Sequence, residues 1–175
     1  MKPTEVVSSS THYGQDSLVL EYDKGDITLY DLPAGRKEQG EDTLPGMIRE
    51  FREETGLSMQ DIENITALRP YTYKMDDGSF HVYPVDIELS ERRDPQGLDV
   101  DEHDGYTWLG PGRVERAGMD GWLNSPKFFN LRYAEAARNG LGDDLQGRGE
   151  GEELVFLDDE VMENHDIDPE EANVA

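Results

Sequence analysis

Residues 35–57 read Gly35-Arg-Lys-Glu-Gln-Gly-Glu41-Asp-Thr-Leu-Pro-Gly-Met-Ile-Arg49-Glu50-Phe51-Arg-Glu53-Glu54-Thr-Gly56-Leu57. Glu50, Glu53 and Glu54 are spaced i, i+3 and i+4, so a helix places all three carboxylates on one face. Like charges at these spacings repel by roughly a few tenths of a kcal/mol per pair, so the helix gains no stability from them. A hard divalent cation such as Mg²⁺ reverses that balance, because it binds carboxylates together with substrate phosphates. The segment therefore predicts a site for a metal ion and phosphate groups.

The residues in and around this segment predict a loop, a helix and a second loop. Pro33-Ala-Gly35 ends an apolar run and opens the first loop. Asp42 or Thr43 suits the N-cap of the helix, and Pro45 is tolerated because it falls in the first turn. Gly56 stands where a helix commonly ends in a left-handed conformation.

The rest of the chain is typical of short strands followed by two helices. Expected strands, separated by turn signals, cover residues 4–8, 17–22, 26–32, 65–73, 79–89 and 106–109. Asp76-Asp-Gly78 is a strong hairpin signal between two of them. Residues 8–14 are expected to form a polar loop or a strand end. Helices are expected over residues 111–116 and from the Ser125-Pro126 cap to about residue 138.

The length of 175 residues suits one domain with extensions. We expect a domain over residues 1–140 and an acidic C-terminal extension over residues 141–175, partly disordered or docked as a short element through Leu154-Val-Phe-Leu157. No stretch approaches the roughly 18 apolar residues of a membrane helix, and the N-terminus lacks an apolar signal-peptide core. These features predict a cytoplasmic protein with no membrane contact. The absence of cysteine excludes disulfides, thiolate metal sites and a cysteine nucleophile.

The net charge is −24, and half of it falls in the extension, where residues 141–175 hold 13 acidic residues and one arginine. In the whole chain, arginine outnumbers lysine by 11 to 5. This composition is typical of proteins adapted to molar salt, where screening removes the repulsion between surface carboxylates. A merely acidic mesophilic protein is the alternative. Either surface repels phosphate backbones, so nucleic acid is not an expected partner.

The segment quoted above resembles the Nudix box, Gly-x5-Glu-x7-Arg-Glu-U-x-Glu-Glu-x-Gly-U, in which U is apolar. Its defined positions are filled without a gap by Gly35, Glu41, Arg49, Glu50, Phe51, Glu53, Glu54, Gly56 and Leu57. The order of the surrounding segments extends the likeness to about residues 4–138. The resemblance implies an α/β fold, the Nudix-type α/β/α sandwich with a mixed sheet, in which the box forms the catalytic loop-helix-loop.

The resemblance also implies roles for the box residues. Glu50, Glu53 and Glu54 are expected to hold one to three Mg²⁺ or Mn²⁺ ions, with the backbone carbonyl of Ala34 as a further ligand. Metal ions at such a site neutralise a diphosphate and acidify water into a nucleophile. Glu53 and Glu54 are therefore expected to be catalytic as well as metal-binding.

The remaining box residues are expected to support these glutamates. Arg49 is implied as a catalytic residue that orients a neighbouring glutamate. Glu41 has two open roles: it accepts N–H bonds from the loop backbone or binds an outer metal ion. Gly35 and Gly56 are expected to be structural.

A carboxylate outside the box is an added ligand or base in many relatives. The segment Asp101-Glu102-His103-Asp104-Gly-Tyr106-Thr-Trp108-Leu109 resembles the Glu-His/Phe-x-x-aromatic-x-Trp segment of dinucleoside tetraphosphate, RNA 5′-pyrophosphate and pterin triphosphate hydrolases. Glu102 is therefore predicted to be a metal ligand and a catalytic residue, with a solvated loop residue as the alternative. Trp108 is expected in the core, and His103 is expected to be a loop histidine, with a proton-transfer role as the alternative.

Substrate contacts outside the box rest on charge and aromatic character. Four cations are predicted to bind the rest of the substrate: Arg69, Lys74, Arg92 and Arg93. Four further side chains are candidates for a base-stacking cleft: Tyr71, Tyr73, Phe80 and His81. Because they lie in strands, where alternate aromatic residues usually pack, they are interpreted as packing residues.

The expected reaction is Mg²⁺-dependent hydrolysis of a diphosphate linkage in a nucleoside diphosphate joined to another moiety. Leu32-Pro-Ala-Gly35 resembles ADP-ribose and sugar-nucleotide hydrolases, whereas Glu102-His103 with Trp108-Leu109 indicates dinucleoside polyphosphate hydrolases. One alternative is removal of pyrophosphate from RNA 5′ ends, which the acidic surface disfavours. Another is a non-catalytic nucleotide-sensing module, which the intact box carboxylates disfavour. Relatives are often dimers, so a homodimer is a further possibility.

Overall fold

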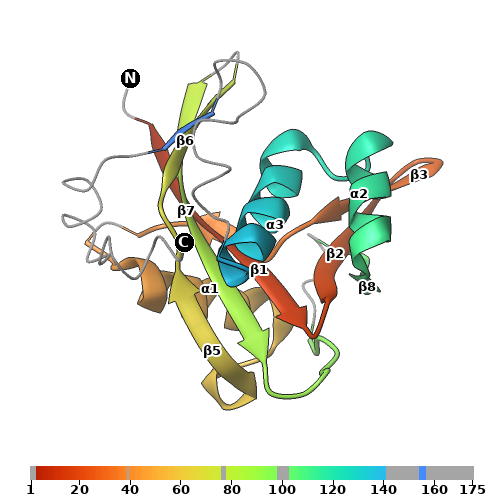
Figure 1. The fold of residues 1–175 in the computed structure, drawn as a ribbon, viewed down its shortest axis with the longest axis horizontal. Helices are drawn as coiled ribbons and strands as arrows, with labels where there is room; N and C mark the ends of the chain where they lie inside the picture. Colours follow the sequence, from red (N-terminus) through yellow and green to blue (C-terminus); the bar gives the residue numbers. More distant parts are fainter. Residues whose placement is uncertain (1–2, 39, 76–77, 98–102, 141–153, 157–175) are drawn as a thin grey trace.

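The computed structural model describes residues 3–38, 40–75, 78–97, 103–140 and 154–156, and these form a mixed sheet with helices on both faces (Figure 1). The strands are β1 (Thr4–Tyr13), β2 (Asp16–Lys24), β3 (Ile27–Asp31), β4 (Ala34–Arg36), β5 (Ile62–Ala67), β6 (Tyr71–Met75), β7 (Gly78–Leu89), β8 (Gly105–Leu109) and β9 (Leu154–Phe156). The helices are α1 (Thr43–Thr55), α2 (Pro111–Met119) and α3 (Ser125–Arg138), with a 3₁₀ turn at Met59–Asp61. Within these ranges, no helix combines the length and the apolar character needed to cross a membrane.

The centre of the sheet is the parallel pair of β1 and β7, which stay in register from Thr4 opposite Phe80 to His12 opposite Glu88. The sheet order is β3-β2-β1-β7-β6-β9. The other edge of β1 is shared, because β4 pairs antiparallel with its first half and β2 pairs with its last residues. This sharing brings β4, and with it Ala34 and Gly35, beside the middle of the sheet.

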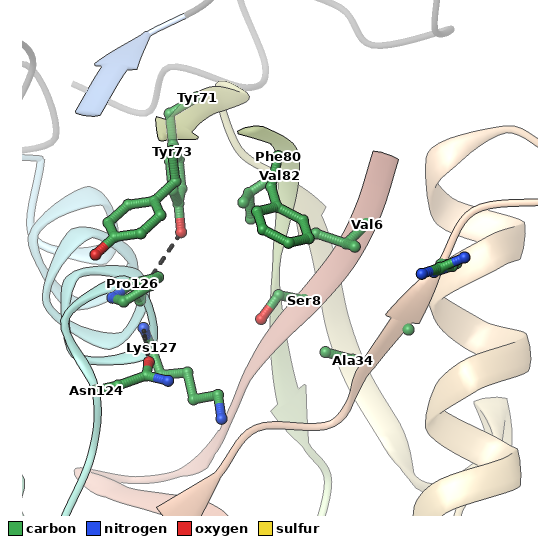
Figure 2. Close-up of a pocket in the computed structure, with 12 residues that line it drawn as sticks. Val6, Ser8, Ala34, Tyr71, Tyr73, Phe80, Val82, Asn124, Pro126 and Lys127 are labelled. Carbon is green, nitrogen blue, oxygen red and sulfur yellow. Dashed lines mark hydrogen bonds between the residues drawn. The ribbon is translucent and has the colours of Figure 1, made fainter. Parts of the chain in front are cut away.

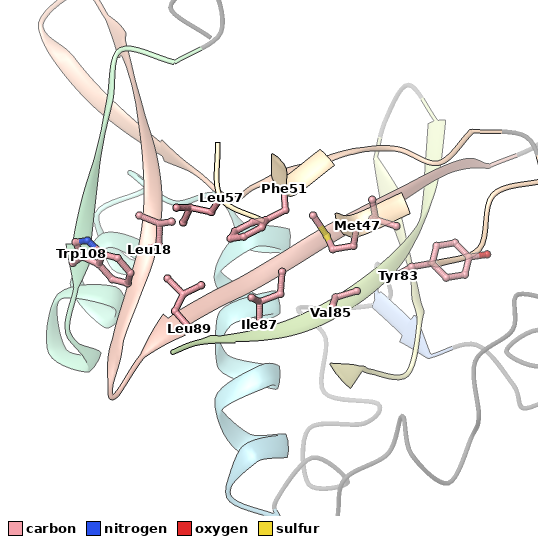
Figure 3. Packing of buried hydrophobic residues seen from close by; sticks show 10 residues of the cluster. Leu18, Met47, Phe51, Leu57, Tyr83, Val85, Ile87, Leu89 and Trp108 are labelled. Carbon is pink, nitrogen blue, oxygen red and sulfur yellow. The ribbon is translucent and has the colours of Figure 1, made fainter. Parts of the chain in front are cut away.

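One face of the sheet is covered by α1, and Figure 3 shows the side chains that pack there. Met47 and Phe51, both fully buried, reach from the helix onto Tyr83, Val85 and Ile87 of β7. These β7 residues are spaced by two, so all three point to this face of the pleated strand. This packing holds the helix, and with it the glutamates, against the sheet.

The opposite face is covered by α3, with α2 beside it, so that the molecule has the α/β/α layers expected from the sequence (Figure 1). Leu131 of α3 packs with Val114 of α2 and Val19 of β2. Further along α3, the fully buried Tyr133 packs against Leu68. The second turn of α3 lies on the same face as the alternate β1 residues Ser8 and Ser10, since the Ser10 hydroxyl donates to the Asn130 carbonyl at 3.1 Å.

The expectation that residues 8–14 form a polar loop or strand end is corrected in one respect: β1 continues through Tyr13. Its polar residues are buried because nearby groups satisfy their hydroxyls. Ser9 Oγ donates to the Pro33 carbonyl at 3.1 Å and lies 3.1 Å from Thr11 Oγ1. His12 Nε2 lies 3.2 Å from Asp86, which also pairs with Arg138 of α3. Pairing with β7 thus outweighs the polar composition.

Other boundaries differ by a few residues. The expected strand over residues 65–73 divides into β5 and β6 around Pro70, because proline cannot donate to the ladder. Helix α2 runs to Met119, three residues beyond the expected end. The N-cap of α3 is Asn124 rather than Ser125, and its side-chain oxygen accepts the Lys127 N–H at 3.3 Å.

Most of the predicted extension, residues 141–175, lies outside the described residues, as do residues 76–77 at the tip of the predicted hairpin. The exception is β9, which forms part of the apolar segment Leu154-Val-Phe-Leu157. It pairs antiparallel with β6, with Leu154 opposite Tyr73 and Phe156 opposite Tyr71. The assignment of residues 1–140 as the domain and 141–175 as an extension stays a prediction.

Gly56 ends α1 as expected: its φ is 72° and its N–H donates to the Arg52 carbonyl at 2.9 Å. A Cβ at this position would lie 2.1 Å from the backbone oxygen of Gln96. We expect Gly56→Ala to lower the free energy of unfolding by more than the roughly 1–2 kcal/mol that a left-handed conformation costs a residue with a Cβ. Chemical denaturation measures this change.

Gly25→Ala is the matched control. Gly25 has a similar φ of 68°, but nothing lies within 4 Å of its Cβ position. An equal loss of stability in the two variants would show that the contact with Gln96 contributes nothing.

Candidate active site

Arg49 connects the carboxylates of the box on the exposed side of α1. Its Nε donates to Glu41 Oε2 at 2.8 Å and its Nη1 to Glu50 Oε1 at 2.9 Å. A longer contact of 3.4 Å joins Nη1 to Glu53 Oε2, one turn further along the helix. A planar guanidinium fixes the directions of the carboxylates that it bonds, and the catalytic role of Arg49 stays a prediction.

Glu41 closes the loop before α1. Its Oε1 accepts the backbone N–H of Glu38 at 3.0 Å and also the Nη2 of Arg49 at 3.0 Å. The hydrogen bond from Arg49 lowers the pKa of the Glu41 carboxyl, although burial opposes the shift. Gly46 makes room for this carboxylate, since a Cβ there would lie 2.8 Å from Oε1. Of the two open roles, the described contacts are those of a loop-backbone acceptor.

Gly35 leaves space for Glu50. A Cβ on Gly35 would lie 2.1–2.3 Å from the carboxylate atoms of Glu50, so no larger residue fits while that side chain keeps its place. The Glu50 side chain is 13% exposed. Burial raises the pKa of its carboxyl, and Glu53 and Glu41 add to the rise, while Arg49 opposes it. A nearby cation would favour the ionised form.

Glu54 turns towards β4, where its Oε2 accepts the N–H of Ala34 at 3.2 Å. The carbonyl of Ala34, the further ligand implied by the sequence, belongs to the same short strand. Glu53 is 57% exposed and lies on the solvent side of the helix. Thus Glu50 and Glu54 are oriented by their neighbours, whereas Glu53 is held only by the long 3.4 Å contact with Arg49 and is more exposed.

The donor set fits a hard divalent cation, because it consists of carboxylate and carbonyl oxygens on two adjoining elements. The space left by the missing side chain of Gly35 holds the Glu50 carboxylate beside β4. In the described part of the chain, however, no three acidic or histidine side chains converge into a ready-made metal cluster. Rotation of the exposed Glu53 side chain is the least costly way to add a donor.

A cavity of about 300 Å³ lies on the other side of β4 (Figure 2). Its lining comes from β1, β4, β6, β7 and the start of α3: Val6, Ser8, Ala34, Gly35, Arg36, Tyr71, Tyr73, Phe80, Val82, Asn124, Pro126 and Lys127. Tyr73 and Phe80 lie at one end and Lys127 at the other, with Ala34 to the side between them. Ala34 and Gly35 therefore belong both to the cavity wall and to the environment of the glutamates.

Tyr71, Tyr73 and Phe80 line this cavity, although their position in strands predicts that they are packing residues. Tyr73 and Phe80 are opposite each other in the β6–β7 hairpin, so the turn at Asp76-Asp-Gly78 was the signal that could have paired them. Tyr71 is 1% exposed, donates to Asn130 Oδ1 at 3.0 Å and is thus largely a packing residue. His81 follows Phe80 and is not among the lining residues, because successive residues of a strand point to opposite faces.

The four predicted substrate-binding cations do not line the cavity. The backbone N–H of Arg69 donates to Tyr133 Oη at 3.1 Å, and Lys74 is exposed on β6. Arg92 lies 3.3 Å from Asp16 and stacks over Trp108, while Arg93 pairs with Asp61 at 3.0 Å. Their role in substrate binding stays a prediction. The cations that do line the cavity, Arg36 and Lys127, were not singled out from the sequence.

The segment around Glu102 is described only in part. Glu102 itself lies outside the described residues, so its predicted role stays open. Trp108 is 7% exposed and packs with Leu18, which confirms its place in the core. His103 lies in a loop, as expected, but it is buried: it is 5% exposed, and its Nε2 lies 3.1 Å from Asp31 Oδ2. The spacing of the segment held no signal for that contact.

Comparison with known proteins identifies the class to which this fold and site belong. The model of the NUDIX domain matches residues 13–129, which is about two thirds of the chain. The protein belongs to the NUDIX family, and it is a hydrolase that acts on pyrophosphate bonds. No curated protein matches this sequence.

Solved structures show the same fold at low identity. A NUDIX hydrolase from Nitrosomonas europaea is 17% identical, with a TM-score of 0.60 over 78% of this chain and 90% of that one. An Ap4A hydrolase from C. elegans, solved as a binary complex, is 20% identical, with a TM-score of 0.59 over 78% and 98%. A MutT protein from Methanosarcina mazei Go1 is 17% identical, with a TM-score of 0.59 over 78% and 96%. At these identities the likeness establishes the fold alone.

Proposed function

We propose that this protein hydrolyses the diphosphate linkage of a nucleoside diphosphate joined to another moiety, with Mg²⁺ or Mn²⁺ as cofactor. The observation that carries the proposal is the position of β4. Ala34 and Gly35 form part of the wall of an aromatic cavity and also touch Glu54 and Glu50. A ligand that fills the cavity with its base therefore has its phosphates beside the box glutamates.

The chemistry of the cavity suits a nucleoside. Tyr73 and Phe80 offer aromatic faces beside the aliphatic side chains of Val6 and Val82. Stacking on an aromatic residue is worth about 1–3 kcal/mol per base and tolerates different bases. Ligand cavities of this kind are mostly apolar, with a few polar groups that fix the orientation. Here Ser8, Lys127 and the β4 backbone are the polar groups.

Enzymes of this family generally use divalent metal ions. The residues that would hold the metal are Glu50, Glu53, Glu54, the Ala34 carbonyl and Glu102. When bound there, the ion neutralises the phosphate charge and lowers the pKa of water.

The side chains of the protein supply the remaining functions. Arg49 holds Glu50 in its buried position, and the Ala34 N–H holds Glu54 beside the substrate-bearing strand. A carboxylate held there accepts the proton of the attacking water. The aromatic cavity keeps the nucleoside in place while the diphosphate is cleaved.

Substrate identity is tested by separating the products formed from ADP-ribose, sugar nucleotides, dinucleoside polyphosphates and (d)NTPs, with Mg²⁺ or Mn²⁺, at low and molar KCl. Cleavage of these linkages yields nucleotides, sugar phosphates or pyrophosphate, so the nucleotide products are what is quantified. Turnover of one class supports the proposal. No turnover by a folded, metal-stabilised protein under every condition would contradict it and favour a nucleotide-sensing module.

Phe80→Ala tests the position of the base. We expect the KM for the best substrate to rise about tenfold or more, because the loss of one stacking face removes about 1–3 kcal/mol of binding. Steady-state kinetics measures the change. His81→Ala is the control, since it alters the next residue on the opposite face of the same strand; equal effects in the two variants would contradict a stacking role.

A further inference from the structure

The end of the cavity opposite the aromatic residues is formed by Lys127, at the start of α3 (Figure 2). Its Nζ lies 2.9 Å from Asp31 Oδ1 on β3. A cation in the first turn of a helix is unfavourable, because the N-terminus carries a partial positive charge. The carboxylate of Asp31 offsets that cost and fixes the direction of a long, flexible side chain.

Asp31 is itself held by a buried histidine. Its Oδ2 accepts the Nε2–H of His103 at 3.1 Å, and its Oδ1 accepts the Leu32 N–H at 2.8 Å. Because a carboxylate only accepts, His103 must carry its proton on Nε2. His103 Nδ1 is buried and has no hydrogen-bond partner among the residues that the structure describes. His103, Asp31 and Lys127 thus form a chain from the protein interior to the cavity.

The charge on Asp31 persists in this chain. Burial raises the pKa of its carboxyl, but the hydrogen bond from His103, the charge and hydrogen bond of Lys127 and the hydrogen bond from the Leu32 N–H outweigh burial and lower it. An ammonium has three N–H donors, and Asp31 occupies one direction. Lys127 is 24% exposed and lines the cavity, so donors remain for a ligand.

The charges of the cavity lining favour an anion. Both charged residues of the lining, Arg36 and Lys127, are cations, although the whole chain carries a net charge of −24. In Figure 2, Lys127 and the aromatic pair lie at opposite ends, and Ala34 lies between them at the side. A ligand with its base on the aromatic residues and its scissile diphosphate at Ala34 needs an additional anionic group to reach Lys127.

We propose that Lys127, positioned by Asp31 and His103, binds a phosphate beyond the scissile pair and selects substrates with three or more phosphates over diphosphates. This inference rests on the function proposed above. The structural alternative is that Lys127 only ties α3 to β3. That alternative predicts a change in stability without a change in selectivity.

The test compares Lys127→Met, Lys127→Arg and the exposed control Lys24→Met, which removes the same charge from β2. We expect Lys127→Met to lower the ratio of kcat/KM for a dinucleoside tetraphosphate to that for ADP-ribose by about tenfold or more, through KM. Lys127→Arg should recover part of the ratio, and Lys24→Met should keep it. Asp31→Asn should also lower the ratio of kcat/KM values. An unaltered ratio in Lys127→Met would overturn the inference.

A binding measurement separates this inference from the proposed function. Calorimetric titration with inorganic tripolyphosphate should show binding to the wild-type protein that weakens about tenfold or more in Lys127→Met but not in Lys24→Met. This result is independent of turnover. Equal binding to wild type and Lys127→Met would overturn the role of Lys127 even if hydrolysis is found, and absence of hydrolysis with altered binding would contradict only the proposed reaction.

Discussion

Replacement of Glu54 by glutamine is expected to lower kcat by about 10²–10⁴-fold, the range observed for loss of a positioned acid–base group. The side chain keeps its size, so an amide oxygen can still accept the Ala34 N–H that Glu54 receives at 3.2 Å. What is lost is the negative charge, which both metal binding and proton acceptance require. Steady-state hydrolysis at saturating Mg²⁺ measures the effect.

A second measurement separates metal binding from proton transfer. A ligand that binds the folded state raises the unfolding midpoint with concentration. If Glu54 is a ligand, Glu54→Gln reduces the rise that Mg²⁺ produces in the wild type. Glu63→Gln, an exposed residue of β5, removes the same charge and should alter neither kcat nor the Mg²⁺-dependent shift. An active Glu54→Gln variant would remove Glu54 from the catalytic residues.

Gly35→Ala is expected to reduce activity strongly while having a smaller effect on folding. The added Cβ would lie 2.1–2.3 Å from the Glu50 carboxylate, so the carboxylate must leave its cradle. Because the displaced atoms are the end of a flexible side chain, the backbone has no need to move. We expect kcat/KM to fall about 10²-fold, comparable to a misplacement of about 1 Å in a catalytic group. Kinetics and thermal unfolding measured on one preparation test both parts.

Gly105→Ala is the control for the backbone effect, since Gly105 begins β8 and nothing lies within 4 Å of its Cβ position. It should retain wild-type kinetics. Activity in Gly35→Ala equal to that of Gly105→Ala would show that the place of Glu50 beside β4 has no role in the reaction.

The helix of the box and its end at Gly56 were predictable because each depends on local chemistry, whereas Ala34–Arg36, expected to belong to the first loop, form β4. The i, i+4 spacing places Glu50 and Glu54 on one face of α1. Gly56 adopts the left-handed conformation that only glycine takes at low cost. The same local reasoning left β1 undecided, since Ser9 and Thr11 suggested either a polar loop or a strand end. They are buried because distant residues, such as Pro33 and those of β7, satisfy their polar groups.

Local sequence reasoning does not identify the residues that line the cavity. Tyr73 and Phe80 have strand periodicity whether they pack in a core or line a cavity, and only the position of α3 leaves space beside them. Lys127 looks like any lysine near a helix start. Its significance depends on Asp31, which is 96 positions earlier in the chain, and on His103, which the sequence suggested to be a loop residue.

The sequence by itself determined the family and the helix of the box with its glutamates on one face, because these follow from residue types at fixed short spacings. The tertiary structure alone decided which side chains line the cavity. Pairing of β4 with β1 brings Ala34 and Gly35 between the glutamates and the cavity, and packing of α3 brings Lys127 to the other end. Such contacts join residues far apart in the chain. Their formation depends on the burial of both faces of the sheet, which no local spacing encodes.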